Sequence, residues 1–146
     1  RVLERVPADR FDWTPHPKSM TLGRLASHVA EIPHWTVPAL KQDEFVMQLG
    51  EYKPWLAADS AELLQKFEET VRQSREALDA CPDEKFGEPW RLKAGDQLIF
   101  ELPRISVLRN MVFNHLYHHR GQLLVYLRLL DVPLPSVYGP TADEPR

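Results

Sequence analysis

Two histidines one helical turn apart stand out in segment 114–122, which reads Asn-His-Leu-Tyr-His-His-Arg-Gly-Gln. Because residues four apart lie on the same side of a helix, the imidazoles of His115 and His119 can point the same way. Ring nitrogens bind zinc at about 2.0 to 2.1 Å, and an i, i+4 pair on a helix accommodates such a site. The spacing therefore makes His115 and His119 candidate metal ligands.

The surrounding pattern predicts that these histidines lie on the buried side of a long helix. Spacings of three and four connect Ile105, Leu108, Val112, His115, His119, Gln122, Tyr126 and Leu129. Two histidines and a glutamine would thus be buried in the middle of the stripe. Buried polar side chains need partners, and a shared metal ion would satisfy these three jointly. The alternative is a pair of core histidines bonded to their surroundings or to buried water, in which case His119→Leu should stabilise the fold. Spacing alone leaves both alternatives open.

A third ligand is predicted at His28, on an earlier helix expected from about 21 to about 35. The buried stripe of this helix is formed by Leu22, Leu25, Val29 and Ile32, and its cap by Ser19 or Thr21. His28 falls about 80° from the centre of the stripe at about 100° per residue, a flank position that suits a cleft between helices. A lone histidine there is also easily satisfied by water or a carbonyl. His118 is a rival ligand, although His119 lies nearer the centre of its own stripe.

The second layer of the predicted site consists of Gln122, which could hydrogen-bond a ligand imidazole, and Tyr126, which could line the pocket. No Glu lies between the paired histidines, so the metalloprotease motif His-Glu-x-x-His is absent, and the single cysteine, Cys81, excludes a cysteine-rich zinc site. Three neutral imidazoles leave positions open for water or substrate. Imidazole nitrogens suit several divalent ions about equally, so the residues do not select one; we name zinc or nickel first, with iron, manganese, cobalt or copper as alternatives.

Further elements must position these residues. A second helix is expected over 59–80, since Asp59 can cap it and a proline follows it. The last helix, which carries the histidine pair, is expected over 103–130. Residues 90–101 form either a hairpin turning at Gly95 or an irregular loop, and the pattern favours neither.

The connections are long and rich in proline, which accounts for many of the 13 prolines. A helical stub over 1–6 ends at Pro7, and a crossover over 38–58 brings aromatic side chains that could form one wall of a pocket. These aromatics include Phe45, Tyr52 and Trp55. The segment 138–144 has no regular period and is expected to lie as a tail over the surface.

Length and composition indicate one domain, 1–146, with 43% hydrophobic and 27% charged residues. The net charge of -3 and the dispersed basic residues leave no basic face for nucleic acid, so no such contact is expected. No apolar run approaches the roughly 20 residues that cross a bilayer, and no signal-peptide layout opens the chain. We therefore expect no membrane contact and a cytoplasmic location.

Three stretches together resemble the DinB-like family of DNA-damage-inducible proteins. They are Ser-Met-Thr-Leu-Gly-Arg-Leu-Ala-Ser-His-Val-Ala-Glu at 19–31, Asn-His-Leu-Tyr-His-His-Arg-Gly-Gln-Leu at 114–123, and Val-Pro-Leu-Pro-Ser-Val-Tyr-Gly-Pro-Thr-Ala-Asp-Glu at 132–144. The resemblance implies that His28, His115 and His119 bind the metal. It also implies an all-α four-helix bundle with long crossover connections, whose first helix is largely absent from this chain. Frequent dimerisation is implied as well, for which Phe113 and Leu124 are the candidate surface residues.

The resemblance implies several functions. Some relatives look like thiol S-transferases, in which the metal binds a small-molecule thiol and lowers its pKa. Others are similar to metal-dependent hydrolases, in which it activates water. A third reading is a stress-linked metal-binding protein without catalysis. Hydrolysis would need a general base, which Asp143 or Glu144 could supply by folding back, whereas a disordered tail would supply none.

Overall fold

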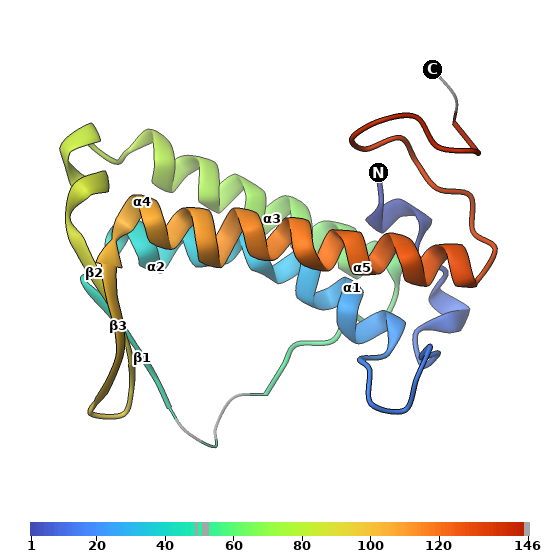
Figure 1. Cartoon of the computed structure of the whole chain (residues 1–146), viewed down its shortest axis with the longest axis horizontal. Helices are drawn as coiled ribbons and strands as arrows, with labels where there is room; N and C mark the ends of the chain where they lie inside the picture. The colour runs from blue at the N-terminus through green and yellow to red at the C-terminus, as the bar shows by residue number, and fades with distance from the viewer. Residues whose placement is uncertain (49, 51–52, 145–146) are drawn as a thin grey trace.

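Three long helical segments run side by side along the molecule, with a small sheet at one end and both termini at the other (Figure 1). The computed structural model describes residues 1–48, 50 and 53–144. The first segment comprises α1 (Leu22–Glu31), a 3-10 turn (Ile32–Trp35) and α2 (Thr36–Lys41); the second is α3 (Ser60–Asp79); the third comprises α4 (Arg104–Val107), a π-helical stretch (Leu108–Asn114) and α5 (His115–Leu129). The long helices expected from the sequence are therefore present.

The helix starts follow the capping residues named above. The Thr21 hydroxyl accepts the backbone N–H of Arg24 at 3.2 Å, and the Asp59 carboxylate accepts that of Glu62 at 2.8 Å. The carboxylate of Glu62 accepts the N–H of Ala58 at 2.6 Å, so the start of α3 is bonded in both directions.

The first helix changes at the expected place, since α1 ends at Glu31 and the 3-10 turn at Trp35, but the helical path then continues through α2 to Lys41, which was not predicted. Pro33 sits in the first turn of the 3-10 stretch. A missing N–H costs little in the first turn of a helix, so the chain tightens there and then resumes α-helical geometry.

The predicted all-α four-helix bundle is also wrong. Within the described residues the long helical segments are joined by a three-stranded mixed sheet of β1 (Glu44–Met47), β2 (Pro89–Ala94) and β3 (Gln97–Pro103). The hairpin alternative holds for β2 and β3, which are antiparallel and turn at Gly95 with φ of +55°. Strand β1 pairs in parallel with the other edge of β2. The four residues of β1 are too few to show a period-two pattern in the sequence. They form a strand because they pair with residues 47 positions away, as Glu44 does with Arg91.

The core consists of two apolar clusters. The cluster at the terminal end joins α1, α3 and α5 through Leu22, Leu25, Leu63, Leu123 and Leu127. The cluster beside the sheet contains Ile32, Trp90, Val107, Leu108 and Val112. Leu116 packs against both clusters and directly follows His115, so the histidine pair lies where the two clusters meet.

The chain ends differ from simple expectations. The stub is a 3-10 turn, Leu3–Arg5, whose neighbours Val2 and Val6 are buried in the core. The segment after α5 is irregular, as expected, yet Asp143 bonds to Arg128 and so holds it against the last helix. Among the described residues, no helix is both long and apolar enough to cross a lipid bilayer.

Candidate metal centre

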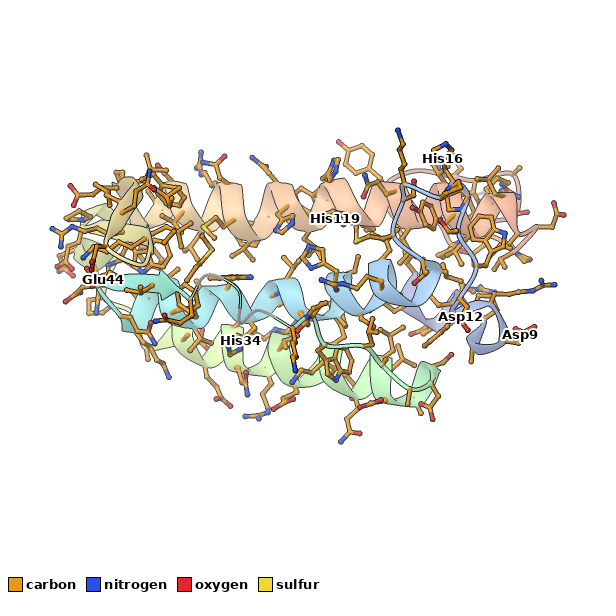
Figure 2. All side chains as sticks on the ribbon, turned by 90° about the horizontal axis from the view of Figure 1, so that it is seen from below. Asp9, Asp12, His16, His34, Glu44 and His119 are labelled. Atoms are coloured by element: carbon orange, nitrogen blue, oxygen red, sulfur yellow. The ribbon has the colours of Figure 1, made fainter. Side chains whose placement is uncertain are left out.

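Three imidazoles from two helices converge in the middle of the molecule. His28 of α1 faces His115 and His119 of α5, and one ring nitrogen from each lies within 4.8 Å of the other two. The Nε2 atoms of His28 and His115 are 3.0 Å apart. Nitrogens bound to one ion at about 2.0 to 2.1 Å lie roughly 3.0 to 3.4 Å from one another, so a small closing movement gives a ligand set. Figure 2 shows His119 in the space between α5 and α1.

Hydrogen bonds orient two of these rings for metal binding. His115 Nδ1 lies 3.3 Å from the carbonyl oxygen of Met111, and His119 Nδ1 lies 2.7 Å from Oε1 of Gln122. A carbonyl oxygen only accepts, so each Nδ1 carries the proton and each Nε2 offers a lone pair. Partners of this kind fix the tautomer of metal-binding histidines. The predicted contact of Gln122 with a ligand imidazole is thus present, while metal binding itself stays a prediction.

The environment also favours uncharged rings. Burial, followed by the neighbouring His119, His115 and Arg24, lowers the pKa of His28 from 6.5 to about 4. Burial likewise lowers the pKa of His119, although its hydrogen bond to Gln122 acts in the opposite direction. Since metals bind the neutral imidazole, His28 and His119 do not have to lose a proton to bind one near neutral pH.

The π-helical stretch changes which residues of the last helix face the core. Ile105 and Leu129, both expected in the buried stripe, are 40% and 59% exposed, whereas Leu123 and Leu127 are fully buried. A π-helical turn holds more residues than an α-helical turn, so a pattern drawn at constant period loses its phase across 108–114. Consequently the histidines sit half-buried on the flank of the stripe, as His28 does on α1.

Other candidate residues lie elsewhere. The Tyr126 hydroxyl donates to the Met20 carbonyl at 3.2 Å, and its ring meets Trp13 edge-on, so Tyr126 contacts the segment just before α1. The rival ligand His118 is exposed, and its ring lies 4.8 Å from that of His119, measured between centroids. The expected wall aromatic Trp55 packs partly buried against the terminal core cluster.

The aromatics of the crossover are only partly placed. Phe45 meets Trp35 edge-on beside the sheet, with 4.9 Å between ring centroids, and so lies in the sheet-side cluster. Tyr52 lies outside the described residues.

The tail carboxylates, which were considered as a general base for the site, fold back onto other residues near the ends of the chain. Asp143 pairs with Arg128, and that hydrogen bond lowers the pKa of Asp143. Glu144 accepts the N–H of Ser136 and pairs with Arg1, which lowers its pKa as well. Both carboxylates are thus engaged with residues of the chain ends.

The sequence reasoning overlooked an ion pair beside the histidines. Arg24 and Glu31 precede and follow His28 by four and three positions, and Arg24 Nη1 lies 3.8 Å from Glu31 Oε2. The charge of Arg24 is among the causes that lower the pKa values of both His28 and His119. The i, i+4, i+7 spacing of Arg24, His28 and Glu31 was the signal that could have placed all three on one face.

Comparison with known proteins agrees with these motifs. A DinB-like protein from Bacillus subtilis has a solved structure that is 18% identical, with a TM-score of 0.68, and covers 92% of this chain and 85% of its own. The structure of a DinB-like protein from Bacillus cereus is 22% identical, with a TM-score of 0.69, and the match covers 94% of this chain and 86% of the Bacillus cereus chain. At these identities the likeness shows the fold alone. No curated protein matches the chain. The model of the DinB family matches residues 1–146, so the chain belongs to the DinB family.

Proposed function

We propose that this protein binds a divalent metal ion through His28, His115 and His119 and uses it to activate a small-molecule thiol for S-transfer. The observation that carries the proposal is the convergence of the three ring nitrogens within 4.8 Å, from two separate helices. A bound divalent ion lowers the pKa of a thiol, so that the nucleophilic thiolate forms near neutral pH. We prefer zinc or nickel as the ion, since imidazole nitrogens suit both.

The protein residues would prepare the site in two ways. The Met111 carbonyl and Gln122 amide hold the tautomers of His115 and His119, so both Nε2 lone pairs are directed to one place. The two apolar clusters, which meet at Leu116, keep α1 and α5 at the separation that the ligand set needs. The remaining coordination positions would be open to a thiol.

Thiol activation is favoured over hydrolysis by the surroundings of the site. Attack by water is commonly assisted by a carboxylate that accepts the proton. The two tail carboxylates considered for this role are engaged by Arg128 and by Arg1 and Arg5. The cluster within ligand distance contains histidines only in the described part of the chain. A thiol with a metal-lowered pKa ionises near neutral pH without such a base.

Metal analysis of purified protein tests the site. Wild-type protein should retain about one ion per chain, and His28→Ala should lower the affinity at least about 100-fold, because removal of a ligand exceeds the 10- to 100-fold effect of outer partners. The matched control is His118→Ala, which removes an exposed histidine next to the site. Stoichiometric metal retained by His28→Ala would rule out the three-histidine site.

Catalysis needs a separate test. Metal-loaded protein should transfer a small thiol to an electrophile faster than metal-free protein, as followed by loss of free thiol. Metal binding without such turnover would instead support a non-catalytic metal-binding protein linked to stress.

We further propose that the protein forms a homodimer through the outer face of the last helix. Phe113, Tyr117 and Val125 are 41%, 53% and 59% exposed there, whereas the other candidate, Leu124, packs partly buried against the core. Exposed apolar faces of this kind mark association surfaces. Light scattering should give twice the chain mass for wild type and the chain mass for Val125→Glu, with Leu56→Glu, at an exposed position on the crossover, as the control.

A further inference from the structure

The π-helical stretch of the last helical segment, Leu108–Asn114, ends directly before the candidate metal ligand His115. It lies in the continuous helical path between α4 and α5 (Figure 1). The π-helical backbone is rare in proteins, and where single turns of it interrupt an α-helix they are frequently found at functional sites. The position of this stretch therefore connects its unusual backbone with the proposed metal site.

The stretch changes the partner of one backbone carbonyl. In an α-helix the N–H of residue 115 would donate to the carbonyl of Met111, four positions earlier. Here the N–H of His115 donates to the carbonyl of Val112 instead. The Met111 carbonyl oxygen lies 3.3 Å from Nδ1 of the His115 ring. The imidazole thus takes the acceptor that an α-helical backbone would have used.

This acceptor matters for metal binding by His115. Which ring nitrogen carries the proton is set by the hydrogen bond that the other nitrogens' surroundings allow, and a carbonyl oxygen holds the proton on Nδ1. The lone pair is then on Nε2, which lies 3.0 Å from Nε2 of His28. The Met111 carbonyl therefore selects the form of His115 that can bind an ion on the side of His28.

Two asparagines form a series of hydrogen bonds along the outer side of the stretch. The side-chain amide of Asn110 donates to the carbonyl of Ser106 at 2.8 Å, and that of Asn114 donates to Oδ1 of Asn110 at 3.4 Å. Both asparagines are exposed. Side-chain amides that bond a carbonyl four positions earlier compete with the α-helical N–H for that carbonyl. The bond from Asn110 to Ser106 therefore favours a departure from α-helical bonding.

The packing of the core does not require the π-helical form. Leu108 and Val112 are the buried residues of the stretch, and both belong to the cluster beside the sheet. They are four positions apart, a spacing that an α-helix also brings to one face. The hydrogen bonds of Asn110 and His115, rather than the apolar contacts, are therefore what distinguishes this stretch from a regular α-helix.

We infer that the π-helical stretch positions His115 for the metal ion and that Asn110, assisted by Asn114, stabilises the stretch in this form. The inference rests on the proposed metal site, and it makes the two asparagines positioning residues, since they act through the backbone before His115. Without the side-chain amide on Ser106, the backbone returns to α-helical bonding, in which the N–H of His115 takes the Met111 carbonyl. The imidazole then loses the acceptor that fixes its tautomer.

Asn110→Ala tests the inference through two measurements. The first is the zinc affinity from calorimetric titration, which should fall about 3- to 10-fold, less than the roughly 10- to 100-fold effect of a residue that contacts a ligand directly. The second is the tautomer of His115 in metal-free protein at alkaline pH, read from long-range proton–nitrogen NMR spectra and assigned with His115→Gln. Wild-type protein should carry the proton on Nδ1, and Asn110→Ala should move much of it to Nε2. A loss of stability alone would not move this proton.

Two further variants serve as controls, with circular dichroism to show that each is folded. Arg109→Ala, at the adjacent exposed position of the stretch, should leave both measurements unchanged. Asn114→Ala should change both in the same direction as Asn110→Ala but by less, because the bond that it removes is longer. Asn114→Ala also decides the matter if Asn110→Ala does not fold.

The outcomes separate this inference from the metal site itself. Wild-type zinc affinity in folded Asn110→Ala would overturn the inference and leave the metal site standing. An unchanged His115 tautomer in that variant would overturn it as well, because Asn110 would then not act through the stretch. Failure of wild-type protein to bind zinc would overturn the metal site and this inference together.

Discussion

The histidine cluster and the tail carboxylates both join distant parts of the chain, His28 to His115 across 87 positions and Arg1 to Glu144 across 143. We call the second group, Asp143 and Glu144 with their arginines Arg1, Arg5 and Arg128, the carboxylate clamp. In the clamp each acid meets a cation and a backbone N–H, from Leu134 or Ser136. In the cluster three imidazole rings turn ring nitrogens toward one another.

The difference separates polar groups that hold distant parts of the fold together from a histidine cluster that could hold a metal ion. In the clamp, each carboxylate already has a cation and a backbone N–H as partners, so it needs no further ligand. The 3.0 Å approach of the His28 and His115 Nε2 atoms brings together a lone pair of His115 and the ring of His28. The two atoms are within hydrogen-bond distance, and the metal ion proposed above would take the place of that bond.

After the loss expected for His28→Ala, the next effect on metal binding concerns Gln122, which distinguishes the cluster from a purely structural group. Gln122→Ala should weaken metal binding about tenfold, because His119 loses the partner that fixes its Nδ1–H tautomer. Calorimetric titration with zinc measures the affinity, and Gln65→Ala, an exposed glutamine on α3, is the control. An affinity equal to that of wild type would mean that Gln122 does not orient a ligand.

The second prediction uses pH on metal-free protein. The pKa of His28 is about 4 in the folded state against 6.5 in the unfolded chain, so the unfolded chain binds more protons between these values. The free energy of unfolding should therefore decrease as the pH falls from about 6.5 to about 4, by about 1 to 2 kcal/mol once solvent screening of the half-exposed ring is allowed for. Urea titrations of wild type and His28→Asn measure it, and an equal slope in both would contradict the assignment.

The smallest effect is expected in the carboxylate clamp. The pKa values of Asp143 and Glu144 are lowered from 3.8 and 4.5, so the stability they confer is present above these values and is lost as the pH falls through the lowered ones. Asp143→Asn should lower the melting temperature slightly at neutral pH, because its pair with Arg128 is exposed. Zinc affinity should not change, and a loss of affinity would show that the tail supports the metal site.

Much of the site was predictable because it depends on local rules. The i, i+4 spacing places His115 and His119 on one face whatever surrounds the helix, and the flank position of His28 followed from the apolar period of α1. The parts that were missed depend on distant partners. Strand β1 exists because β2 offers it an edge, and the phase of the buried stripe on the last helix changes at a π-helical stretch that residue spacing does not reveal.

The sequence by itself determined the types of donor, the starts of α1 and α3 at Thr21 and Asp59, and the pairing of two histidines, since these arise from interactions three or four residues apart. The tertiary structure alone decided that His28 meets His115 and His119 and that the tail carboxylates pair with Arg1, Arg5 and Arg128. The physical reason is that a charged side chain takes whichever partner the packed chain brings within reach. For Glu144 that partner is Arg1, 143 residues away, a contact that no local pattern encodes.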